Sequence, residues 1–258
     1  MHLQKMSRAA LERAASQQEE AMNRLRRAIG LIGVALPPLL LGAVLGIGVP
    51  MQNSISEFYF TAMRDVFVLT LTGIGVVLIT YYGYDRRPGE ILSDWGVSTT
   101  AGAGALAVAL VPTLCDSAAA QAAPSPSLFD RLIASDSLQN TLHFGAAGVF
   151  LTALAIMCLR LFPKSDSPAP GRHKTRRNRL YRACGWVILA MVAALLTVKL
   201  ILGDPFGWDP AWHFTFWVET VAVWAFGLAW LVKGAALSRQ LTFLHGPDAP
   251  EPGPNSGK

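Results

Sequence analysis

The chain has 258 residues, of which 52% are hydrophobic and only 15% are charged, and its mean hydropathy is +0.37. Soluble domains carry about 25% charged residues, so this composition excludes an ordinary soluble domain and indicates a membrane protein. The net charge of +5 predicts no nucleic-acid partner, because a membrane protein needs Lys and Arg on its cytoplasmic side in any case.

The first 28 residues mix charged side chains with the apolar residues Leu11, Ala14, Ala15, Met22 and Leu25. This pattern predicts an amphipathic helical segment at the cytoplasmic surface over residues 1–28. The segment is too long and too charged to begin a signal peptide, and no small-residue cleavage site follows the first apolar run. We therefore expect no cleavage.

Six apolar runs have roughly the 20-residue length of a membrane-spanning helix. They are Gly30–Gly48, Ala62–Tyr82, Val97–Cys115, Thr141–Phe162, Tyr181–Leu202 and Phe214–Lys233. The runs predict an all-α protein, a polytopic transmembrane helical bundle with six spans over residues 29–234. Residues 235–258, rich in Pro and Gly, are predicted to form a disordered cytoplasmic tail.

Two of these runs have distinctive composition. Pro37 and Pro38 in the first run predict a kink, because a proline inside a helix loses a backbone hydrogen bond and clashes with the preceding turn. The third run is rich in Gly, Ala, Ser and Thr, with Ala101 and Ala105 four residues apart. Small residues let helix backbones approach closely in lipid, so we expect this helix to lie centrally in the bundle; a loosely packed, lipid-facing helix is the alternative.

Basic residues alternate sharply between the loops. The N-terminal segment, the second and fourth loops and the tail together hold 19 of the 22 Lys and Arg residues. Cytoplasmic loops carry the excess of Lys and Arg, so both termini are predicted to be cytoplasmic and the number of spans to be even. The predicted location is the cell inner membrane, with membrane lipids as partners and homo-oligomers as a further possibility.

Ionisable residues within spans are costly and usually face the bundle interior or a cavity. Seven of them fall toward the predicted non-cytoplasmic side and form a candidate ligand-binding cluster: Glu57, Arg64, Asp65, His143, Lys199, His213 and Glu219. Their convergence on one side predicts a site for a lipid or a small ligand.

Simpler roles compete for some of these residues. Ser54 and Glu57 match the capping box S-x-x-E and would cap the second span, while Arg64 can extend to the interface. Asp65 lies about three turns beyond Ser54, so capping does not explain it. It needs a partner, for which Lys199 is the natural choice, and a structural ion pair and a functional role both stay open.

Other acidic residues are expected to cap helices and are left out of the site. Asp136 would cap the fourth span, together with Gln139, and Asp209 would cap the sixth, with Pro210 at its first helical position. Glu219 would then lie roughly 15 Å along the sixth helix, near mid-membrane depth, where a carboxylate should be protonated or paired.

The two histidines are weaker candidates for metal binding. His213 is six residues from Glu219 and thus rotated off its face, so this pair alone is no metal site. His143 could complete one only through tertiary packing. No metal is predicted, although zinc stays open as an alternative, which would need at least three protein ligands.

Five stretches carry a resemblance: "SISEFYFTAMRDVFV", "YYGYDRR", "LHFGAAGVFLTALAIMCLRLF", "RNRLYRACGW" and "WVETVAVWAFGLAWLVKG". From about Leu31 to Gly234 the chain resembles a family of bacterial integral-membrane proteins of unknown function, which implies a small helical bundle in the cell membrane. It resembles more distantly the alkaline ceramidase and adiponectin receptor superfamily of seven-span, zinc-dependent hydrolases. It departs from that superfamily by lacking the paired His-x-x-x-His of the last span and by having six predicted spans.

Three classes of function follow. The favoured one is a membrane protein without an assigned activity, non-catalytic, whose polar cluster stabilises the bundle or binds a lipid or small ligand. The second is a metal-dependent membrane hydrolase acting on lipid amides. The third is a small proton-coupled transporter or channel in which Glu219 and Asp65 titrate. The sequence has no G-x-S-x-G, H-E-x-x-H or Walker A motif, and no internal repeat of the kind many transporters have.

Overall fold

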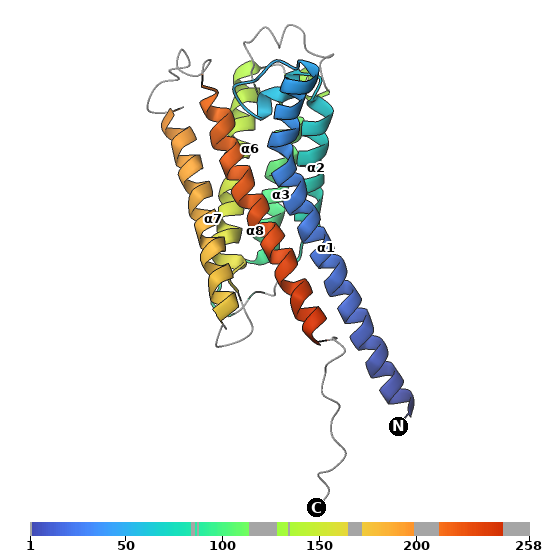
Figure 1. Ribbon diagram of the computed structural model, residues 1–258. Helices are drawn as coiled ribbons and strands as arrows, with labels where there is room; N and C mark the ends of the chain where they lie inside the picture. The colour runs from blue at the N-terminus through green and yellow to red at the C-terminus, as the bar shows by residue number, and fades with distance from the viewer. Residues whose placement is uncertain are drawn as a thin grey trace, which may run out of the picture.

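The computed structural model describes residues 2–83, 86, 88–113, 128–133, 135–164, 172–198 and 212–244. Within these ranges all regular structure is helical, which confirms the predicted all-α class. Figure 1 shows long helices packed side by side in one bundle, with the start of the first and the end of the last at the same end of it.

Six long helices lie within the described ranges. They are α1 (His2–Ile47), α2 (Arg64–Thr80), α3 (Asp94–Leu110), α6 (Asp136–Ile156), α7 (Arg172–Leu196) and α8 (Phe214–Leu244). Shorter elements are the 3-10 helix η1 (Ser56–Phe60), α5 (Leu128–Leu132) and the π-helical turn η2 (Met157–Leu161), which directly follows α6. The N-terminal amphipathic segment and the first apolar run belong to one uninterrupted helix, α1.

Among the described residues, four helices contain a stretch long and apolar enough to cross a membrane. These stretches are Arg13–Ile47, Asp136–Leu161, Lys174–Leu196 and Phe214–Ala235. Helices α2 and α3 have 17 residues each, or roughly 25 Å at 1.5 Å per residue, which is the lower limit for a span. The helices therefore support a multi-pass membrane protein, and the number of six spans stays a prediction.

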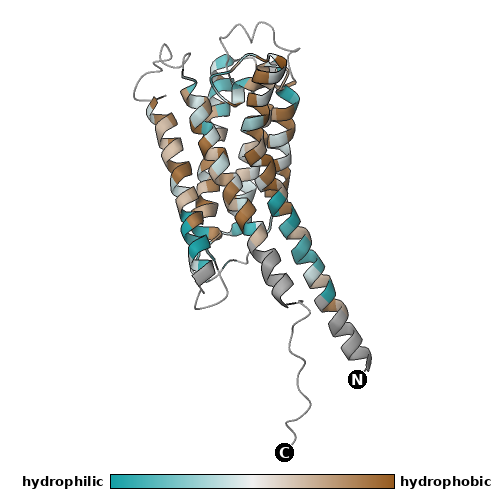
Figure 2. Cartoon of the chain, in the orientation of Figure 1, coloured by the Kyte–Doolittle hydropathy of each residue, from teal (hydrophilic) through white to brown (hydrophobic). Residues whose placement is uncertain are grey.

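The surface of the bundle is largely apolar. Figure 2 shows hydrophobic residues along the lengths of the packed helices, and hydrophilic residues gathered near the ends of the bundle and on the part of α1 that extends beyond it. Large side chains such as Leu39, Leu69 and Trp186 are more than half exposed. Lipid would cover them, as expected for a protein whose solvent is the bilayer.

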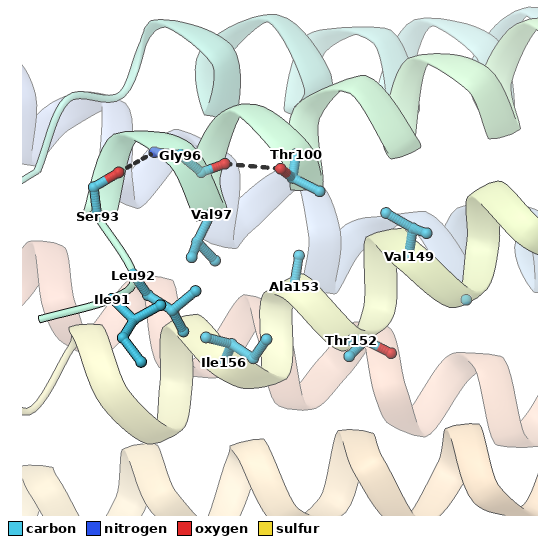
Figure 3. A pocket seen from close by; sticks show the side chains of 11 residues that line it. Ile91, Leu92, Ser93, Gly96, Val97, Thr100, Val149, Thr152, Ala153 and Ile156 are labelled. Atoms are coloured by element: carbon cyan, nitrogen blue, oxygen red, sulfur yellow. Dashed lines mark hydrogen bonds between the residues drawn. The ribbon is translucent and has the colours of Figure 1, made fainter.

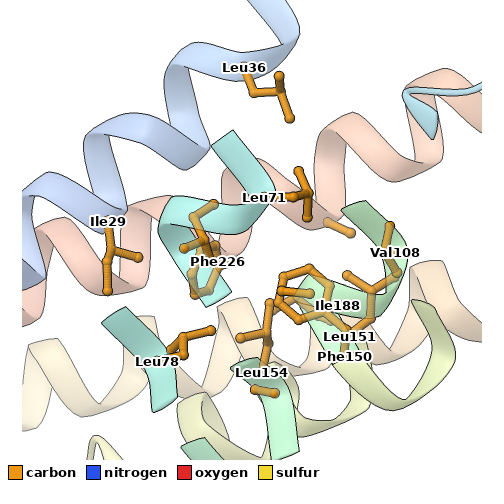
Figure 4. Packing of buried hydrophobic residues seen from close by; sticks show 14 of the residues in the cluster. Ile29, Leu36, Leu71, Leu78, Val108, Phe150, Leu151, Leu154, Ile188 and Phe226 are labelled. Carbon is orange, nitrogen blue, oxygen red and sulfur yellow. The ribbon is translucent and has the colours of Figure 1, made fainter. Parts of the chain in front are cut away.

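The bundle is held by a closed chain of neighbouring helices, in which α1 packs on α8 and α2, α3 on α2 and α6, and α7 on α6 and α8. Ala101 and Ala105 of α3 are fully buried, but α3 has two main neighbours like the other helices of this closed chain, so its central placement stays a prediction. Figure 4 shows side chains from all six long helices meeting in one apolar core, including Leu36, Leu78, Leu154, Ile188 and Phe226, which come from five of them.

Glycines bring α1 and α8 into backbone contact. A Cβ placed at Gly30 would lie 2.7 Å from the carbonyl oxygen of Gly227, and one at Gly227 would lie 2.8 Å from the carbonyl oxygen of Gly30. Because real Cβ atoms do not approach backbone atoms this closely, only glycine fits at either position. Close backbone approach through small residues is a major source of helix association in lipid.

Helix α1 continues through Pro37 and Pro38. In an α-helix the N–H of residue 38 would bond to the carbonyl of residue 34, and Pro38 has no N–H. The indole Nε1 of Trp224, on α8, donates to the carbonyl oxygen of Val34 at 3.1 Å. The neighbouring helix thus supplies the donor that the proline removes, which is how prolines are tolerated within membrane helices.

Candidate functional site

Three of the seven candidate residues, Glu57, His213 and Glu219, converge on the segment that precedes η1. The Glu219 carboxylate accepts the backbone N–H of Ile55 at 2.7 Å. The Glu57 carboxylate accepts the N–H of Asn53 at 3.2 Å, and His213 Nδ1 lies 3.1 Å from Asn53 Oδ1. Each of these groups is engaged with a neighbouring loop or helix of the protein.

Asn53 is the centre of this arrangement, although its residue type alone gave no signal in the sequence. Besides those two contacts, its carbonyl oxygen accepts the N–H of Phe216, in the first turn of α8, at 2.7 Å. The first N–H groups of a helix lack partners within the helix, so Asn53 satisfies one of them from another segment. The arrangement fastens the start of α8 to the loop after α1.

The last helix begins where the predicted sixth run begins, but its expected cap position is wrong. Helix α8 starts at Phe214, directly after His213, whose φ is +47°; residues 212 and 213 are not helical, so Pro210 is not its first helical position. The proposed cap Asp209 lies outside the described residues. Glu219 is therefore in the second turn of α8, roughly 8 Å along its axis at 1.5 Å per residue, rather than the roughly 15 Å expected for a helix that starts at Pro210.

Half of the capping box predicted for Ser54 and Glu57 is present, at a different helix, while the Glu57 carboxylate accepts the N–H of Asn53 rather than that of Ser54. Ser54 Oγ accepts the N–H of Glu57 at 3.1 Å, and this bond lies at the start of η1, because α2 begins only at Arg64. Asp65 thus sits in the first turn of α2, where a carboxylate interacts favourably with the helix dipole. Its side chain is exposed, and the choice between an ion pair and a functional role stays open, because the suggested partner Lys199 lies outside the described residues.

The remaining candidates lie apart or outside the described residues. Arg64 packs its guanidinium 4.4 Å from the ring centre of Tyr59 and donates to the Tyr59 carbonyl at 2.8 Å. His143 is buried on α6, with Nδ1 2.6 Å from the carbonyl oxygen of Val111 at the end of α3. Lys199, the suggested partner of Asp65, lies outside the described residues.

These positions do not assemble one site. Within the ranges the structure describes, no three His, Cys, Asp or Glu side chains are grouped so that they could hold a metal ion. His143 lies within hydrogen-bond distance of a carbonyl oxygen at the end of α3. Glu57, His213 and Glu219 contact the loop around Asn53. Glu57, His143, His213 and Glu219 therefore act as ties between segments.

A groove with a volume of about 550 Å³ lies between α3 and α6. It lies beside the first turns of α3 and the second half of α6, and it is lined by Ile91, Leu92, Ser93, Gly96, Val97, Thr100, Gly148, Val149, Thr152, Ala153 and Ile156. Figure 3 shows apolar side chains from both helices and from the preceding loop around it.

Most polar groups in the groove form hydrogen bonds within their own helices. Ser93 Oγ accepts the N–H of Gly96 at 2.9 Å as the cap of α3, and Thr100 donates to the Gly96 carbonyl at 2.8 Å (Figure 3). The groove thus offers an apolar wall to a ligand. Sequence reasoning missed it, and the available signal was the small residues at 96, 148 and 153, which leave space between two apolar helices.

An ion-paired lysine fixes the loop at one end of the groove. Lys164 Nζ lies 2.7 Å from Asp94 Oδ1 and 2.9 Å from Glu90 Oε2. Burial lowers the pKa of Lys164, but hydrogen bonds and charge attraction from Asp94 and Glu90 together outweigh it, so the pKa is raised overall. The two pairs hold the residues just before and after Ile91, Leu92 and Ser93.

We expect the two ion pairs of Lys164 to stop stabilising the folded protein at alkaline pH. The pKa of Lys164 is raised above the ordinary value of about 10.4, so its contribution is complete below that pH and is lost as the pH rises through the folded-state pKa. Lys164→Met should lower the free energy of unfolding by about 1 kcal/mol at neutral pH, a value limited by solvent screening. Thermal unfolding of both proteins across the alkaline range should show the difference shrinking; a constant difference would contradict the assignment.

In comparisons with known proteins, no family model, curated protein or solved structure matches the chain. The candidate function therefore rests on the chemistry of the described residues.

Proposed function

We propose that this protein is a six-span membrane protein of the cell inner membrane, with both termini cytoplasmic, that holds the acyl chain of a membrane lipid in the groove between α3 and α6. The observation that carries the proposal is an apolar groove of about 550 Å³ on two neighbouring helices. That volume lies within the range of about 300–1,000 Å³ typical of ligand pockets.

The surroundings of the groove favour a lipid over a water-soluble ligand. Ile91, Leu92 and Trp95 are exposed next to it, and large exposed apolar side chains of this kind mark membrane or ligand contact. The polar residues predicted to bind a ligand are hydrogen-bonded within the protein instead. An acyl chain needs no polar partners, and the groove offers few.

The positions of the basic residues support the orientation. The N-terminal part of α1 and the start of α7 lie at the same end of the bundle (Figure 1), and these are the segments in which most Lys and Arg residues fall. The groove borders the first turns of α3, at that same end. The lipid would therefore come from the cytoplasmic leaflet, because cytoplasmic segments carry the excess of positive charge.

Filling the groove should remove the bound lipid. Gly148 lines the groove and has no atom within 4 Å of the position of a Cβ, so Gly148→Trp should fill the groove without disturbing the bundle. Native mass spectrometry of the purified protein should show a co-purified lipid that this variant has lost.

The matched control is Gly42→Trp, on α1, where a Cβ also meets nothing within 4 Å and which lies away from the groove. It should retain the lipid. Equal lipid content in the wild type and in both variants, with all three folded, would overturn the proposed function.

A further inference from the structure

Buried hydrogen-bond donors without acceptors gather where α1 meets α8, away from the lipid groove. Asn23 Nδ2, Arg26 Nε and Trp230 Nε1 are buried and have no hydrogen-bond partner. All three residues are at least nine-tenths buried. Buried polar groups are nearly always satisfied, so these neighbouring donors call for an acceptor that the described part of the chain does not supply.

The two terminal nitrogens of the Arg26 guanidinium, Nη1 and Nη2, are hydrogen-bonded to neutral groups only. Its Nη1 donates to Asn23 Oδ1 at 2.8 Å, and its Nη2 lies 3.3 Å from the hydroxyl oxygen of Tyr81. Among the described residues Arg26 forms no ion pair. A buried guanidinium without a counter-charge is costly, because burial removes its hydration.

The surrounding charges increase this need. Lys233, buried on α8, is close enough to feel the positive charge of Arg26 and those of Lys174 and Arg177 on α7. Asp94 also acts on Lys233, but its carboxylate is already engaged by Lys164 at 2.7 Å. The local balance of charge is therefore positive.

A cavity of about 20 Å³ lies at this place, lined by Met22, Leu25, Arg26, Val77, Thr80, Tyr81 and Trp230. About 10–15 Å³ of such volume holds one water molecule, so the cavity takes one particle of that size and excludes a phosphate or carboxylate. The groups of the cavity lining left without partners, Arg26 Nε and Trp230 Nε1, are donors, and a water molecule could accept from them but would leave the charge of Arg26 unbalanced. A monatomic anion only accepts.

We propose that this cavity binds a single halide ion, chloride under ordinary conditions, held by Arg26 and by the indole N–H of Trp230, with the amide of Asn23 one helical turn away. The ion would neutralise the buried guanidinium and satisfy the free donors. It would thereby join α1, α2 and α8, since Arg26, Tyr81 and Trp230 come from or directly follow these helices. The site is separate from the proposed lipid groove.

The test is the thermal stability of the purified protein in sodium gluconate, titrated with sodium chloride or bromide at constant total sodium. A ligand that binds only the folded state raises the unfolding temperature with its concentration. We expect a rise with chloride and with bromide whose concentration dependence follows single-site binding. Identical stability in gluconate and chloride would overturn the proposal, whether the cavity is empty or holds water.

Two variants locate the effect. Trp230→Phe keeps an aromatic ring against Tyr81 and Phe162, which lie 5.2 Å from it, but removes the N–H, and should weaken apparent chloride binding by about tenfold or more. Asn23→Asp places a carboxylate beside Arg26 and should abolish the chloride dependence while the protein remains folded in gluconate.

The matched control is Trp224→Phe, which removes an indole N–H that serves Val34 instead. It should lower the unfolding temperature in every salt and keep the full chloride response. If all three variants respond to chloride as the wild type does, the salt effect is non-specific and the proposed site is wrong.

Discussion

Replacing Gly30 with valine is expected to separate α1 from α8 and to lower the free energy of unfolding by about 3 kcal/mol, the upper end for overpacked sites. A Cβ at this position would lie 2.7 Å from both the carbonyl oxygen of Gly227 and the backbone N of Leu231. These are backbone atoms of a helix, so no side-chain rotation relieves the clash. Two helices would have to move apart along an interface that buries much of the core.

Unfolding by denaturing detergent, followed by circular dichroism, would measure this loss. The matched control is Gly42→Val, on the same helix, where a Cβ meets no atom within 4 Å. That change should be within about 0.5 kcal/mol of the wild type, as for most exposed substitutions. Equal stability of the two variants would show that the close approach of the helices contributes nothing.

Glu219→Ala is expected to release the loop after α1 from the start of α8, at a cost of about 2 kcal/mol, because a hydrogen bond to a charged group is lost and a donor is left unpaired. The carboxylate accepts the N–H of Ile55 at 2.7 Å. Glu219→Gln keeps an oxygen that can accept the same N–H. It should therefore cost clearly less, about 1 kcal/mol or below.

The two substitutions distinguish a structural role for Glu219 from a role in proton coupling. A structural tie predicts that the glutamine variant is nearly as stable as the wild type and behaves like it in proton-flux assays in vesicles. If the glutamine variant instead abolishes a proton flux that the wild type shows, the carboxylate titrates in function, and the transporter alternative gains its first support. Hydrogen exchange at the Ile55 amide would report directly on the tie.

Composition and apolar runs predicted the helical class well, because burial in lipid forces the backbone to satisfy its own hydrogen bonds. The described part of each predicted run overlaps a separate long helix. The ends of the helices were predicted less well, since capping depends on contacts with distant segments. Ser54 and Glu57 do bond as a cap, but they begin η1, and the last helix starts four residues after Pro210.

The candidate site was predicted only from the expected depth of each residue in the membrane and from the side of the membrane toward which it lies. Sequence reasoning could go no further than this. Glu57, His213 and Glu219 do converge, but around Asn53, which is uncharged and carried no pattern. His143 is directed to a carbonyl of another helix. The position of a residue along its helix indicates its level in the membrane. Which residues at one level are in contact depends on the rotation of each helix about its axis.

The bond between Trp224 and the Val34 carbonyl also restricts how the protein can move. Gly30 and Gly227 interlock one turn away from it, and Gly234 packs against the carbonyl of Asn23 two turns farther along. Sliding α8 along α1 by a single residue, about 1.5 Å, would break the indole bond and drive the glycine contacts into collision. The two helices would therefore keep a fixed register and travel as one rigid unit, so any opening of the bundle would occur between this pair and the other four helices.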